Sequence, residues 1–241
     1  MTLAATYRLG TRLFWQDRGL LIGSVVTPVG LAIGMPLLMR HVRADGVSAA
    51  ADMFDGTLAL LLSITAFMNI AMALSARRDQ LVLKRLRATT LTDARILGGQ
   101  VAATATQTVA VVAACVVAVH LVAGVPYPAN PLLFGAAVVA GALVLATLGA
   151  ACTAAIPRAE LGGAVCMPVF LVSGIASGAM GPIRQVLPSW VGVLLDLLPT
   201  TAVVDAVRTG AVARPALLLA VWGVAGLVAI RLWFRWEPRR S

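Results

Sequence analysis

The sequence predicts an all-α membrane protein with six transmembrane helices and no separate soluble domain. Hydrophobic residues make up 60% of the 241 residues and charged residues only 12%, whereas soluble domains contain roughly 25% charged residues. Long apolar runs recur along the chain, and about 20 apolar residues suffice to cross a hydrocarbon core ~30 Å thick. The charged residues gather between these runs, so residues 1–241 are interpreted as a single transmembrane domain.

The chain begins with an amphipathic segment, residues 1–18, which we expect to lie as a helix in the membrane interface. Arg8 and Arg12 lie away from its apolar stripe, and Trp15 has a ring suited to the headgroup region. The alternative is that this segment is only the irregular start of the first span, about residues 20–39.

A basic island, residues 76–93, follows the second predicted span, about residues 56–75. The island contains Lys84, which is the only lysine in the chain. Its aliphatic residues Val82, Leu83 and Leu86 fall on one side of a helix, and its basic residues occupy the rest. By itself, this charge is typical of a loop that stays near anionic lipid, where each basic residue contributes about 1 kcal/mol. The aliphatic face exceeds what membrane topology requires and indicates a docking surface.

The third span is predicted at about residues 94–123. Thr90, with Asp93 three residues later, resembles a capping box that would start this helix. The span ends at the loop G-V-P-Y-P-A-N-P, because three prolines cannot continue a helix. The fourth span, about residues 131–156, is rich in Ala and Gly.

The fifth apolar run, about residues 161–178, leads into an unusual stretch. Residues 179–199 are apolar but interrupted by three prolines, so the runs between them are too short to cross a membrane. We expect this stretch to re-enter the outer leaflet, where neighbouring helices can satisfy its backbone. The sixth span is predicted at about residues 215–234.

The distribution of Lys and Arg predicts which side of the membrane each segment faces. With both termini in the cytosol, the inner segments hold most of the 19 basic residues, while the acidic residues divide evenly. This asymmetry satisfies the positive-inside rule. The protein is therefore expected to be a multi-pass protein of the cytoplasmic membrane. The basic residues assigned to the outer side are Arg40, Arg43, Arg184, Arg208 and Arg214.

Several other classes of function are disfavoured. A net charge of +9 could indicate nucleic acid, but few aromatic residues are available for base stacking, and membrane lipid accounts for the charge. Cys115, Cys152 and Cys166 all fall within apolar runs, so neither a disulfide framework nor a metal site is expected.

The order of several motifs resembles type-2 ABC exporter permeases. The island sequence Q-L-V-L-K-R-L-R-A-T-T-L is similar to the family motif E-x-G-T-L-K-R-L-R-A-T-P-L. Downstream, F-L-V-S-G at 170–174, L-P-S-W at 187–190 and L-L-P-T-T-A-V-V-D-A-V-R at 197–208 follow in the order typical of the family. Gln80 and Leu81 replace the usual acidic residue and glycine.

The resemblance implies that the island is a coupling helix in a cleft of a separate ABC ATPase subunit, and that two permeases and two ATPases assemble. ATP and Mg²⁺ would bind to the partner, and no cofactor is expected on this chain. Its single lysine follows a leucine, so the chain has no phosphate-binding loop of the G-x-x-x-x-G-K-[ST] type. By resemblance, the residues that contact the ATPase are Asp79, Leu83, Lys84, Arg85, Leu86 and Arg87.

The expected function is that of a non-catalytic permease subunit that exports an amphipathic drug, antibiotic or lipid-like molecule. Its partner permease would be a second copy or a paralogue. The weak polarity of the spans suggests four residues for the substrate path. These are Gln100, Gln107, Met167 and Ser173.

Two alternatives remain. A secondary carrier or channel would work without ATP, but such carriers usually place carboxylates within their spans, and none is evident here. An intramembrane hydrolase could use Ser173 as nucleophile and His120 as base, but Ser173 lacks the preceding G-x pattern of intramembrane serine proteases.

Overall fold

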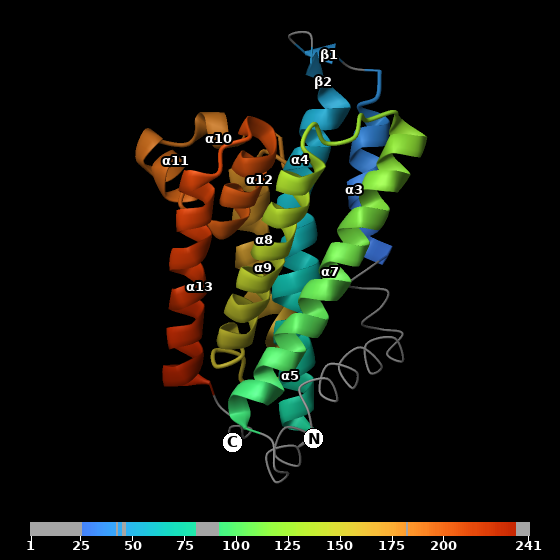
Figure 1. Ribbon diagram of the computed structural model, residues 1–241. Coiled ribbons are helices and arrows are strands. Elements are labelled where there is room, and N and C mark those ends of the chain that lie inside the picture. Colours follow the sequence, from blue (N-terminus) through green and yellow to red (C-terminus); the bar gives the residue numbers. More distant parts are fainter. Residues whose placement is uncertain (1–25, 42, 45–46, 81–91, 182, 235–241) are drawn as a thin grey trace.

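Long helices side by side make up most of the computed structural model (Figure 1). It describes residues 26–41, 43–44, 47–80, 92–181 and 183–234. Within this part of the chain, five helices are long and apolar enough to cross a membrane, or six if one sharply bent helix pair forms a single span. The predicted class, an all-α membrane protein, is confirmed.

The expected spans correspond to helices with somewhat different bounds. The first expected span is described only from residue 26, and the 12-residue helix α3 is its regular part. A short antiparallel hairpin of two strands, β1 and β2, separates α3 from α4. The elements in chain order are α3 (Thr27–Leu38), β1 (Arg43–Ala44), β2 (Val47–Ser48), α4 (Ala49–Leu62), η2 (Ser63–Met68), α5 (Asn69–Asp79), α7 (Asp93–Ala123), α8 (Pro131–Cys152), η3 (Ala159–Leu161), α9 (Gly162–Ser177), α10 (Ile183–Val186), α11 (Ser189–Leu195), α12 (Pro199–Thr209) and α13 (Ala213–Trp233).

The second span is the centre of the bundle. Helix α4, the π-helical turn η2 and α5 form one rod from Ala49 to Asp79, and 78% of its most apolar window is buried inside the molecule. The corresponding share for α13 is 11%, so α13 lies at the edge. The rod carries the basic island at its end, and the island is therefore attached to the most enclosed helix of the fold.

Glycines let α8 approach this central rod closely. A side chain at Gly149 would overlap the carbonyl oxygen of Phe67 in η2, and its Cβ would lie 2.7 Å from the Cγ2 of Ile70. At Gly141, a Cβ would lie 2.5 Å from the Cγ2 of Val203 on α12. Small residues at such positions allow helix backbones to approach, which is how membrane helices gain packing energy.

The helix starts are only partly as expected. Helix α7 begins at Asp93, with an extended Thr92 as its N-cap and no side-chain capping bond. The predicted capping box at Thr90 and Asp93 is therefore wrong, because Asp93 is the first helical residue and does not occupy the third position. Helix α8 has a side-chain cap, since the Oδ1 of Asn130 accepts a hydrogen bond of 3.1 Å from the N–H of Leu133.

The segment before the last span consists of short helices, and its re-entry into the outer leaflet stays a prediction. Residues 179–199 form a turn and the two short helices α10 and α11, with Trp190 and Val193 exposed. The deeply buried helix follows them: α12 packs against α4, α8, α9 and α13, and its axis is bent by 87° from that of α11. Most of the buried residues of this region belong to α12, which begins at Pro199, where the predicted re-entrant stretch ends.

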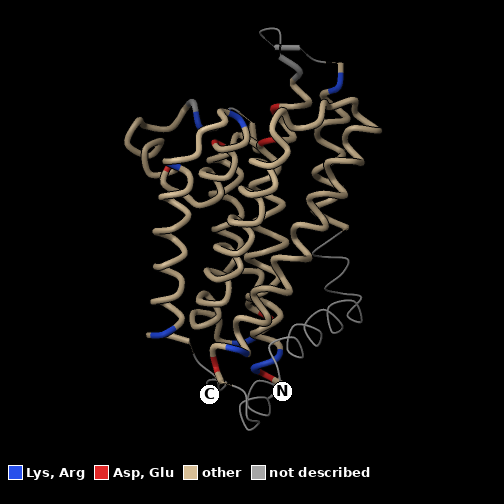
Figure 2. The backbone as a smooth tube through the Cα atoms, viewed as in Figure 1, with Lys and Arg blue, Asp and Glu red and all other residues tan. Residues whose placement is uncertain are grey.

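Charged residues lie at the two ends of the bundle, and the middle is free of them in the described chain (Figure 2). One end, here called the island end, holds the end of α5 and the start of α7 (Figure 1). The opposite end holds β1, β2 and α10 to α12. This arrangement suits a protein whose middle lies in hydrocarbon. The assignment of the island end to the cytosol stays a prediction.

Candidate functional site

The sequence places the candidate site at the island end. Five of the six predicted ATPase contacts, Leu83 to Arg87, lie outside the described residues. The sixth, Asp79, is the last residue of α5. The described part of the site is therefore the foot of the island, the R-R-D sequence at residues 77–79.

Arg78 is fully enclosed at this foot, with only 2% of its side chain exposed. Its Nη1 donates a hydrogen bond of 3.0 Å to the carbonyl oxygen of Thr153, and its Nη2 donates one of 2.7 Å to that of Ile156. A longer contact of 3.4 Å reaches the carbonyl of Pro157. These oxygens belong to the end of α8 and the turn after it, where helical carbonyls lack partners of their own. A guanidinium is well suited to this place because its donors form a rigid fork and its charge opposes the negative end of the helix dipole.

Asp79 extends the same contact to the next element. Its Oδ2 accepts a hydrogen bond of 2.7 Å from the N–H of Ala159, the first residue of η3. Its Oδ1 lies 3.6 Å from the Nε of Arg78, so the two neighbouring side chains also form an ion pair. Adjacent residues of α5 therefore bind both ends of the short turn between α8 and η3.

Arg77 joins α5 to the helix on the other side of the island. Its Nη1 donates to the Oε1 of Gln100 on α7. Gln100 is buried, so this contact lies inside the bundle, where a polar group left unpaired would be costly.

The three consecutive side chains thus connect α5 with α7, with the end of α8 and with η3. The island leaves the bundle from α5 and returns to it at α7. Residues 77–79 therefore bind the end of α5 to three neighbouring elements. From the sequence alone, Arg77 and Arg78 count only among the basic residues that predict the topology. An arginine at the last turn of a buried helix was the signal for their structural role.

The four residues suggested for a substrate path do not form one cluster. Gln100 is paired with Arg77 near the island end, and Gln107 is half-buried further along α7. Met167, on α9, is 47% exposed on the surface of the bundle. Ser173, also on α9, is buried and accepts a hydrogen bond of 3.3 Å from the hydroxyl of Thr200. Their role in a path stays a prediction.

The two residues considered for hydrolysis, His120 and Ser173, each contact other residues and not one another. The Nδ1 of His120 lies 2.9 Å from the carbonyl oxygen of Val125, and its ring stacks on Tyr127 at a centroid distance of 4.0 Å. Ser173 is bound to Thr200 instead. Within the described ranges, no group of three or more His, Cys, Asp or Glu residues could hold a metal ion.

Comparison with known protein families identifies a match over most of the chain. The family model described as ABC-2 type transporter matches residues 3–212, which extends through α12 to the start of α13. No curated protein matches the chain.

Proposed function

We propose that this chain, which belongs to the ABC-2 type transporter family, exports an amphipathic small molecule or lipid-like compound, driven by ATP. Family membership makes it the permease subunit of an ABC transporter, a multi-pass membrane subunit without catalytic activity. Subunits of this family work with an ABC ATPase. The direction of transport, the type of cargo and the route of coupling are the proposed parts.

The contact network of Arg77, Arg78 and Asp79 is the observation that supports coupling most strongly. An ATPase that moves the island can do work on the permease only if the foot of the island is firmly attached to the spans. The buried guanidinium of Arg78 provides this attachment through three backbone carbonyls. In the proposed mechanism, the aliphatic residues Leu83 and Leu86 dock on the ATPase, and residues 77–79 pass its movement to α7 and α8.

Nucleotide chemistry belongs to the partner in this proposal. ATP and Mg²⁺ bind to the ATPase subunits, and their binding or hydrolysis changes how these subunits are arranged. Such a change can bias the permease only if one arrangement of the spans fits the ATPase better than the other. A second permease, identical or paralogous, completes the proposed dimer.

The apolar lining of the cavities supports an amphipathic cargo. A cavity of about 590 Å³ between α8, α12 and α13 is lined by aliphatic and small residues, among them Leu143, Ala216 and Leu219. The ATP-independent carrier remains the alternative function. It is less well supported because the described carboxylates lie toward the two ends of the bundle (Figure 2).

The docking claim can be tested by co-purification with a candidate ABC ATPase, for instance one encoded beside this chain. We expect the wild type to retain the ATPase and the double variant Leu83→Asp/Leu86→Asp to lose it. A matched control is Leu132→Asp, which changes an exposed leucine at the opposite end of the bundle and should leave the association intact. Equal retention by the double variant would overturn the docking claim.

Export itself needs a second measurement. The complex, reconstituted in vesicles, should hydrolyse ATP faster when amphipathic candidate compounds are added, and it should move them only in the presence of ATP. Transport by the permease alone, without ATP or a partner, would favour the carrier instead.

A further inference from the structure

We propose that a groove between α7, α8 and α13 at the island end binds an anionic phospholipid, with its phosphate on Arg231 and an acyl chain along the groove. The proposal goes beyond export, because it concerns a resident lipid on the outer surface of the bundle and does not depend on the cargo or on the ATPase.

The groove lies where α7 and α13 pack side by side on α8. Helices α7 and α13 both pack on α8. A Cβ at Gly226 of α13 would lie only 3.1 Å from the Cγ2 of Thr147 on α8, so these two helices are in close contact. The space left between α7 and α13 has a volume of about 630 Å³ and reaches Thr147 on α8.

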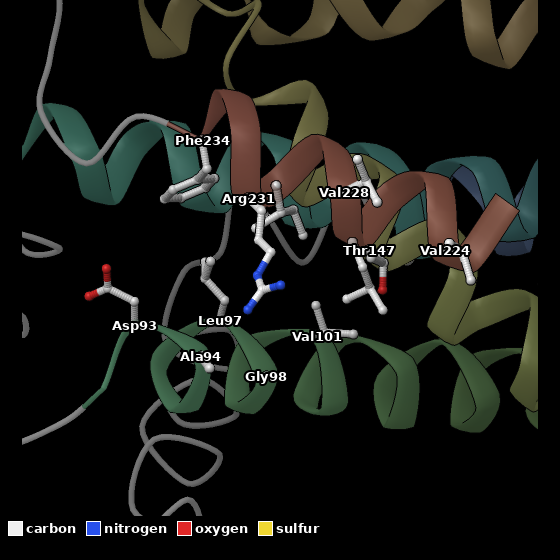
Figure 3. A pocket seen from close by; sticks show the side chains of 12 residues that line it. Asp93, Ala94, Leu97, Gly98, Val101, Thr147, Val224, Val228, Arg231 and Phe234 are labelled. Carbon is white, nitrogen blue, oxygen red and sulfur yellow. The ribbon is translucent and has the colours of Figure 1, made fainter.

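Aliphatic side chains line most of this space. Leu97 and Val101 face it from α7, and Val224 and Val228 face it from α13 (Figure 3). Val224 and Val228 are also exposed on the surface of the bundle, so the groove is open toward the surrounding lipid. Such a lining suits a hydrocarbon chain and offers few hydrogen-bond partners to a polar molecule.

One cation is placed within this apolar lining. The side chain of Arg231 extends from α13 toward α7, and its guanidinium lies between Leu97 and Val101 (Figure 3). No hydrogen bond or ion pair joins Arg231 to another described residue. Asp93 stands at the end of the groove, apart from the guanidinium, and has an interaction of its own. Because an arginine stays charged under all ordinary conditions, a guanidinium in this setting favours an anionic partner.

The ligand that combines both requirements is an anionic phospholipid. Its phosphate can take two parallel hydrogen bonds from a guanidinium, and its acyl chain matches the aliphatic lining. Arg231 lies in the last turn of α13, at the end of the bundle, where long basic side chains meet lipid headgroups. This end is predicted to face the cytosol, and anionic lipids concentrate in the cytoplasmic leaflet.

Gly98 offers a way to block the groove without disturbing the fold. It lines the groove from α7, and a Cβ built there would meet no atom within 4 Å. A leucine at this position would fill space that the proposed lipid occupies, and it would not weaken the helix, because leucine has a higher helix propensity than glycine. Gly135 on α8 is the matched control, since its Cβ also meets nothing within 4 Å and it does not line the groove.

The test measures lipid retained by the full-length protein. Protein from nanodiscs containing equal amounts of phosphatidylglycerol and phosphatidylcholine is released into mild detergent, and bound lipid is counted by native mass spectrometry. We expect the wild type to retain phosphatidylglycerol preferentially. Arg231→Gln should lower this retention by about tenfold, because it removes a charge-assisted bidentate contact. Gly98→Leu should lower it by about as much, because the leucine side chain fills space that the lipid would occupy. The controls Arg158→Gln, an exposed arginine at the same end, and Gly135→Leu should retain as much as the wild type.

Any of three results would overturn the proposal. The first is equal retention of both lipids by the wild type. The second is equal retention of phosphatidylglycerol by the Arg231→Gln and Arg158→Gln variants. The third is preferential retention that appears only after Glu237→Gln, which would assign the groove to the chain's own C-terminal segment.

Discussion

Two arginines, one at each end of the bundle, donate hydrogen bonds to carbonyl oxygens near the end of a helix, but in different surroundings. Arg78 donates to the carbonyl of Thr153 at the end of α8, and Arg184 donates a hydrogen bond of 3.0 Å to the carbonyl of Ala176 near the end of α9. Arg78 has 2% of its side chain exposed and joins elements about 75 residues apart in sequence. Arg184 is 38% exposed, and its partners, including Asp196 at 2.5 Å, all lie nearby in the chain.

The difference indicates how each end can behave. The island end is held by long-range contacts, of which those of Arg78 to Thr153 and Ile156 are buried, so its elements should move together. The opposite end is held by a local, half-exposed ion pair, so α10 and α11 should be able to rearrange without the rest of the bundle. In the proposed export function, the firmly held end would receive the movement of the ATPase, and the more loosely held end would open.

The largest expected effect is at Arg78. Arg78→Ala removes the donors to the carbonyls of Thr153 and Ile156 and should lower the free energy of unfolding by about 3–5 kcal/mol, the range for breaking a buried charged contact. The measurement is thermal unfolding in mild detergent, followed by tryptophan fluorescence. Arg158→Ala, an exposed arginine at the same end, should leave the transition in place, and a similar shift in both variants would contradict the comparison.

A smaller effect is expected from two glycines of α8. Gly149→Ala, near the island end, would push a methyl group into the backbone at Phe67 and should cost about 1–3 kcal/mol of stability by overpacking. Gly135→Ala, near the other end of α8, meets no neighbour within 4 Å and should be neutral or slightly stabilising. The same unfolding assay compares them. Equal costs at the two positions would mean that α8 is not packed more tightly against the central rod at the island end.

The smallest effect is expected at the opposite end. Arg184→Ala breaks the ion pair with Asp196, but half-exposed pairs of this kind contribute only about 0–1 kcal/mol. Unfolding should therefore change little, whereas hydrogen exchange of α10 and α11 should increase, since local contacts hold these helices. Destabilisation of the whole bundle as large as that of Arg78→Ala would remove the distinction between the two ends.

The sequence was informative where hydrophobicity and charge alone determine the outcome. Apolar length predicted the long helices, and charge distribution predicted that the charged residues would lie between the spans. The motif order around Lys84 indicated the family. The family model that matches residues 3–212 confirms it. These features are local or compositional, so a single chain reveals them.

The sequence did not predict the long-range contacts or the position of α12. Nothing near Arg78 in the sequence identifies Ile156 or Pro157 as its partners, because they are brought together only when α8 packs on α5. Helix α12 carries Asp205, Arg208 and a leading proline, and no span was predicted over these residues. Its burial follows from packing against four other helices. The start of α7 was predicted at about residue 94 and lies at Asp93, but its N-cap is Thr92, which the sequence did not distinguish from the neighbouring Thr90.

The most direct test of coupling through the foot of the island compares ATP hydrolysis by the reconstituted permease–ATPase complex across three proteins. These are the wild type, Arg78→Lys and Arg184→Lys. A lysine keeps the charge but lacks the forked donors that reach several carbonyls. The account predicts that both variants bind the ATPase, that Arg78→Lys loses the increase in ATP hydrolysis caused by the permease, and that Arg184→Lys keeps it. An Arg78→Lys complex that hydrolyses ATP as the wild type does would contradict the account.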